Sequence, residues 1–194
     1  MATGSPTADL GAFAAGAEFA DLPDDVVDVA TRMVIDTVGV GLAATVEPIA
    51  DRAQVALQSP SAAVPTLSSE SAGTVRDAAL HNGILTHALD YDDVHEGMGG
   101  HPSAPVVAAL LPLAYREGCS GSEFLVSLLV GAEAEIRLAE ALNPGLYERG
   151  WHPTSVTGTV GAAVAAAAFM DCSAAEIQRA IGVARSEERR VGKE

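Results

Sequence analysis

The chain has 194 residues, a length that fits one domain or part of one. Hydrophobic residues make up 48% of the sequence and charged residues 19%, which is typical of a globular protein and excludes a disordered one. Its 26 acidic residues against 11 Lys and Arg give a formal net charge of −15, which argues against binding to nucleic acid or to an anionic membrane. The first ten residues lack a basic and apolar leader, and the most apolar run, residues 156–170, is shorter than the roughly 20 residues that span a bilayer. We therefore expect a cytoplasmic protein.

Apolar residues recur at helical spacing through most of the chain. This spacing predicts helices over about 7–20, from Pro23 to residue 38, and over 47–58, 74–89, 104–117, 120–142, 154–170 and from 174 onward. The one extended segment is expected at Val64–Ser68. Because the other strand signals are missing, the sequence predicts an all-α fold and excludes a Rossmann unit.

Two capping boxes mark predicted helix starts, Ser120 with Glu123 and Ser173 with Glu176. The segment Gly158–Ala168 consists almost entirely of Gly, Ala and Val, so its helix can approach its neighbours closely. We expect this helix to lie at the centre of the fold.

Four of the five histidines, His81, His87, His95 and His101, lie within 21 residues of one another. The same segment holds Asp90, Asp92, Asp93 and Glu96. Such a concentration of titratable groups in a mostly apolar chain is typical of a functional site, although a solvated polar loop would give the same pattern.

Two histidines, His101 and His152, each precede a proline. A residue before proline avoids the helical conformation, and proline suits the first helical turn, so each histidine should lie just ahead of a helix N-terminus. Free backbone N–H groups there favour an anion, and Ser103 and Thr154 add hydroxyl donors. The two sites would converge on one ligand with two carboxylates, or else they are two unrelated helix starts.

The segments HALDYDDVHEGMGGHPSAPV and RGWHPTSVTGTVGAA, taken together, closely resemble the MmgE/PrpD family. That family includes 2-methylcitrate dehydratases, cis-aconitate decarboxylases and iminodisuccinate epimerases. The resemblance runs from about Leu10 to Ala184. Val94 departs from it, because many members have Thr at this position.

The resemblance implies an all-helical domain with a smaller α/β lid domain, a homodimer, a small carboxylate substrate, and neither metal nor organic cofactor. It assigns Asp90, His101 and His152 as the candidate catalytic residues. His101 and His152 would transfer protons or stabilise an oxyanion, and Asp90 would act as an acid, a base or an orienting group. Ser103 and Thr154 are candidate substrate-binding residues, and Arg149 could hold a substrate carboxylate.

The resemblance also implies that residues 1–184 form only the N-terminal part of the helical domain, without the lid. The last ten residues, RSEERRVGKE, hold seven charges and the only lysine of the chain, so we expect them to be foreign to the fold. The implied function is that of a cofactor-independent lyase resembling 2-methylcitrate dehydratase, with little turnover by this chain alone. A decarboxylase or an epimerase of the same family is the nearest alternative.

Three further alternatives stay open. Asp92, Asp93 and Glu96 resemble the acidic magnesium motif of helical isoprenoid synthases, which requires a continuous helix. His87, Asp90, His95 and His101 could instead ligate the metal of a hydrolase. The chain could also be a non-catalytic helical fragment that assembles with a partner.

Overall fold

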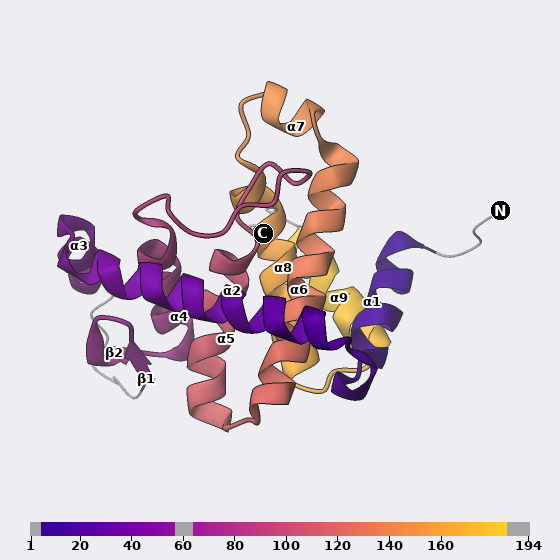
Figure 1. Cartoon of the computed structure of the whole chain (residues 1–194), viewed down its shortest axis with the longest axis horizontal. Coiled ribbons are helices and arrows are strands. Elements are labelled where there is room, and N and C mark those ends of the chain that lie inside the picture. The colour runs from indigo at the N-terminus through magenta and orange to yellow at the C-terminus, as the bar shows by residue number, and fades with distance from the viewer. Residues whose placement is uncertain (1–4, 57–63, 186–194) are drawn as a thin grey trace, which may run out of the picture.

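The computed structural model describes residues 5–56 and 64–185, which are helical apart from loops and one short hairpin (Figure 1). The α-helices are α1 (Pro6–Gly16), α2 (Asp24–Ala43), α3 (Pro48–Ala56), α4 (Val75–His87), α5 (Ser103–Glu117), α6 (Gly121–Leu142), α7 (Gly145–Glu148), α8 (Pro153–Phe169) and α9 (Ala174–Ala184). Two short 3-10 helices, Phe19–Asp21 and Ala44–Val46, flank α2. The all-α prediction is confirmed. Of the charged tail that the sequence analysis set apart, residues 186–194 lie outside the described residues.

Helices α6 and α8 pack closely against each other. A β-carbon added to Gly131 of α6 would lie 2.6 Å from the Ala165 side chain and 2.8 Å from the backbone oxygen of Gly161. The two helix backbones therefore touch along a line of small residues. Val164 and Ile177 are fully buried beside this contact, where α9 packs on α8. The prediction of a close-packed Ala- and Gly-rich helix is confirmed.

The long helix α2 crosses the front of the molecule in Figure 1 and packs on α4, α5 and α6. Ala30 and Thr37 on its inner side are completely buried. By length and composition alone, Asp24–Val46 could cross a membrane, with a mean hydropathy of 1.4, so the sequence reading missed this apolar stretch. Of the apolar window, 28% is buried in the structure, where α2 packs on three other helices.

The sequence analysis did not predict the second strand of a hairpin, the helix α7, a third capping box or the two 3-10 helices. A hairpin of β1 (Val64–Thr66) and β2 (Ser69–Gly73) extends the one expected strand into an antiparallel pair. The single turn α7 interrupts the loop before α8. A third capping box, formed by Thr74 and Asp77, starts α4, in addition to the two predicted boxes, which the structure confirms.

Candidate active site

The candidate site is built on the loop that joins α4 to α5, residues 88–102. Asp90 adopts a left-handed conformation with φ of 51°, which Asp tolerates better than most residues, and this turns the chain away from α4. The N–H of His95 donates to the backbone oxygen of Gly100 at 2.9 Å and closes the loop on itself. Because the acidic motif lies in this loop, the continuous helix that an isoprenoid synthase needs there is missing.

The structure brings the three predicted catalytic residues together. His101 Nε2 lies 3.3 Å from Asp90 Oδ1, and the ring centroids of His101 and His152 are 6.1 Å apart. All three residues line one cavity of about 590 Å³, with Tyr147 and Trp151 on its wall. The juxtaposition that the two His-Pro motifs predict is therefore present, while the chemical roles of these residues stay predictions.

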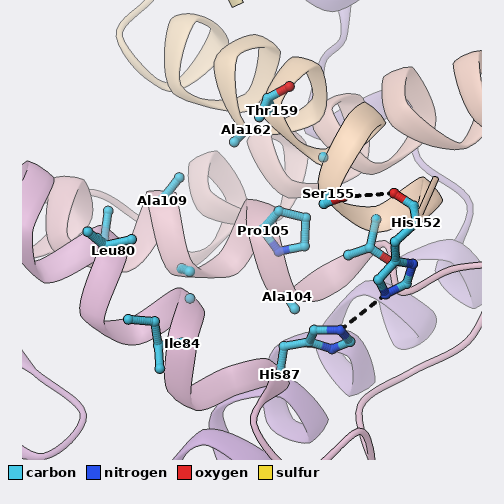
Figure 2. A pocket seen from close by; sticks show the side chains of 15 residues that line it. Leu80, Ile84, His87, Ala104, Pro105, Ala109, His152, Ser155, Thr159 and Ala162 are labelled. Atoms are coloured by element: carbon cyan, nitrogen blue, oxygen red, sulfur yellow. Dashed lines mark hydrogen bonds between the residues drawn. The ribbon is translucent and has the colours of Figure 1, made fainter. Parts of the chain in front are cut away.

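His87 and Asp92 complete the site, and the sequence analysis did not assign either of them a catalytic role. His87, in the last turn of α4, has its Nε2 atom 3.4 Å from that of His152 (Figure 2). Asp92 has a fully buried side chain and lies 3.1 Å from His87 Nδ1 and 3.4 Å from His101 Nδ1. The signal in the sequence was the acid five residues after a helical histidine, but loop geometry decides whether such a pair meets.

An apolar groove of about 500 Å³ leads away from His87 and His152 between α4, α5 and α8. Figure 2 shows Leu80 and Ile84 of α4 opposite Ala162 of α8, with Pro105 of α5 between them. The two imidazoles thus lie where an apolar groove meets the site.

The three candidate substrate-binding residues have different environments. Thr154 lines the groove, and its Oγ1 accepts the backbone N–H of His101 at 2.9 Å, which joins the two His-Pro motifs. Ser103 is fully buried and donates its hydroxyl to Asp93. Arg149 is exposed and is not among the residues that line the cavity.

A side chain already occupies one donor residue of the expected anion site at the N-terminus of α5. Asp93 Oδ1 accepts the backbone N–H of Ser103 at 3.2 Å, in addition to the hydroxyl hydrogen bond. The carboxylate therefore satisfies a free N–H of the helix that a substrate carboxylate would otherwise use. A substrate carboxylate would have to compete with Asp93 for the Ser103 donors, and the substrate-binding role of Ser103 stays a prediction.

The pKa of His87 is raised above its ordinary value, whereas that of His152 is lowered. The hydrogen bond to Asp92 raises the pKa of His87 and outweighs the opposing effect of burial. Burial lowers the pKa of His152, and the charges of His87 and His101 lower it further. Within this pair, His87 therefore takes up a proton before His152 does.

Two groups of side chains at the site have the spacing of a metal centre. Single ligand atoms of His87, His101 and His152 lie within 4.8 Å of one another, and the same is true of His87, Asp90, Asp92 and His101. Three of the four residues proposed as ligands of a metal hydrolase, His87, Asp90 and His101, therefore lie close enough to share a metal ion. The fourth, His95, is absent from both groups, and its Nδ1 accepts the N–H of Met98.

Comparison with known proteins identifies the relatives of this chain. It is 31% identical over 182 residues to a human cis-aconitate decarboxylase, and the matched region covers 88% of this chain and 37% of the relative. It is 28% identical over 191 residues to the cis-aconitate decarboxylase-like protein oryM of Aspergillus oryzae, covering 93% of this chain and 40% of the relative. The chain thus spans about two fifths of these proteins. Residues 8–191 match the MmgE/PrpD N-terminal domain, and the chain therefore belongs to the MmgE/PrpD family.

Proposed function

We propose that the chain contributes the acid–base groups of a cofactor-independent lyase that acts on a small di- or tricarboxylate. The observation that supports this proposal most directly is the cavity shared by Asp90, His101 and His152. Decarboxylation of cis-aconitate is the first candidate reaction, because the relatives are named for it. Dehydration of 2-methylcitrate is the second.

Both reactions need proton transfer beside a carboxylate. Loss of CO2 leaves a carbanion that a protonated group must neutralise, and dehydration needs a base for the carbon and an acid for the departing hydroxyl. The histidines supply groups with separated pKa values, since that of His87 is raised and that of His152 is lowered. An imidazolium at His87 would also offer a positive charge to an anionic substrate in a chain of net charge −15.

The test is turnover of cis-aconitate and of 2-methylcitrate, with substrate-induced changes in the imidazole NMR signals as a measure of binding. We expect His101→Gln and His152→Gln to lower turnover by roughly 10²- to 10⁴-fold, the usual contribution of a general acid or base. His95→Gln is the matched control, because His95 does not line the cavity. Absence of both turnover and substrate-induced shifts would reject the proposal.

A metal-dependent reaction is the alternative to a cofactor-independent lyase, because the imidazole nitrogens are spaced as metal ligands are. Activity that EDTA removes and Zn²⁺ restores would favour it, whereas activity unchanged by EDTA supports the cofactor-independent lyase. The non-catalytic alternative and the expected homodimer are tested by light scattering alongside the assay. Stable assembly without binding of either substrate would favour an assembly fragment.

A further inference from the structure

Asp92 is the carboxylate around which the site is arranged. Its side chain is fully buried, and its Oδ1 atom lies 3.1 Å from His87 Nδ1 and 3.4 Å from His101 Nδ1. The backbone oxygen of Asp92 also lies 3.4 Å from His101 Nδ1. The Nδ1 atoms of both rings therefore face oxygen atoms of one residue.

These contacts determine where each ring carries its hydrogen. An ionised carboxylate and a backbone carbonyl only accept hydrogen bonds, so the Nδ1 atoms of His87 and His101 must donate. A buried carboxylate without such donors is costly, which favours the arrangement in which both rings donate to Asp92. In a neutral imidazole with a hydrogen on Nδ1, the Nε2 atom is an acceptor.

We propose that Asp92 is a positioning residue that holds His87 and His101 in the same tautomer, with the hydrogen on Nδ1 and both Nε2 atoms directed into the site. Its importance for turnover rests on the proposed lyase function. The tautomers themselves do not depend on that function.

The proposal has a consequence for each neighbour of the two Nε2 atoms. His152 Nε2, 3.4 Å from the Nε2 of neutral His87, must donate the hydrogen of that contact. Asp90 Oδ1, 3.3 Å from the Nε2 of His101, is also an acceptor, so this contact becomes a hydrogen bond only when one of the two groups binds an additional proton.

The test is the nitrogen NMR spectrum of the imidazoles in the full 194-residue chain, recorded where the rings are neutral. We expect a protonated Nδ1 and an unprotonated Nε2 for both His87 and His101. His95 is an internal control of the opposite tautomer, because its Nδ1 accepts the N–H of Met98 and its hydrogen must be on Nε2. A hydrogen on Nε2 of neutral His87 or neutral His101 in the wild-type chain would overturn the proposal, even if no variant folds.

Asp92→Asn removes the charge but keeps the shape of the side chain. We expect it to shift His87 toward the tautomer with hydrogen on Nε2 and to reduce turnover about 10- to 100-fold, as loss of an orienting partner does. His101 should shift less, because the backbone oxygen of residue 92 still accepts from its Nδ1. Asp93→Asn is the matched control, because Asp93 bonds Ser103 and should leave both tautomers unchanged. An unchanged His87 tautomer in Asp92→Asn would refute the role of the Asp92 side chain. The expected tautomers in a wild-type chain without turnover would refute only the lyase function.

Discussion

His87 and His152 are 65 positions apart in the chain, yet their Nε2 atoms lie 3.4 Å from each other. One residue is in the last turn of α4 and the other is the N-cap of α8. At this distance the two rings share a hydrogen bond when one of them donates. Charge on one ring must then affect the protonation of the other.

This contact predicts the response of His152 to loss of its neighbour. His87→Gln should raise the pKa of His152, because the positive charge of His87 lowers it, although burial, the larger effect, should keep it below its ordinary value. NMR titration of the His152 ring measures the change. His95→Gln is the control and should leave the titration as it is in the wild type. A His152 titration that is the same in His87→Gln would contradict the coupling.

Much of the site could be predicted from the sequence because its signals are local. Proline after His101 and after His152 determines that both precede helices, and the structure places His152 at the N-cap of α8. His87 and Asp92 could not be given their roles in this way. Their contact depends on the loop after α4, where the left-handed conformation of Asp90 sets the direction of the chain.

The fold shows the same division between local and tertiary information. Helix positions follow from spacing and capping residues, as at Ser120 and Ser173. The short strand β2 was missed because SESAG has no apolar alternation, and its pairing with β1 comes from the antiparallel hairpin. The burial of Glu135 was also missed, because the sequence does not distinguish it from the partly exposed Glu133 of the same helix.

Glu135 should make the stability of the chain depend on pH. Burial, helped by the nearby charge of Asp93, raises its pKa to about 9, and no hydrogen-bond partner is found for either oxygen among the described residues. Between the ordinary pKa of 4.5 and about 9 the unfolded chain has lost this proton and the folded chain keeps it. The free energy of unfolding should therefore fall with rising pH, by up to about 1.4 kcal/mol per pH unit from this group.

Glu135→Gln removes this dependence because the amide does not ionise. The variant should gain stability relative to the wild type as the pH rises from 5 to 9, measured by urea denaturation. Glu133→Gln on the same helix is the control, because Glu133 is partly exposed and bonds Arg137. If Glu135→Gln and the wild type lose stability in parallel over this range, Glu135 is ionised in the folded chain.

The contact between α6 and α8 should not tolerate a methyl group. Gly131→Ala would place its β-carbon 2.6 Å from the Ala165 side chain, so we expect a loss of about 1–3 kcal/mol of stability from overpacking. Gly39→Ala is the control, because nothing lies within 4 Å of its added carbon on the exposed side of α2. That variant should gain roughly 0.5–1 kcal/mol from helix propensity. Thermal denaturation of both variants tests this pair, and equal shifts would contradict the close packing.

Thr154 should matter through the hydrogen bond it accepts from the His101 backbone. Thr154→Val keeps the shape but removes the acceptor, which leaves a part-buried N–H without its partner and should cost about 1–3 kcal/mol. It should also reduce turnover, because His101 is held in place partly from this side chain. Thr154→Ser keeps the oxygen and should retain most of the stability and of the activity. Denaturation and turnover measured on both variants separate the hydrogen bond from the volume of the side chain. Equal losses in Val and Ser would contradict the prediction, because Ser keeps the oxygen that accepts the His101 N–H.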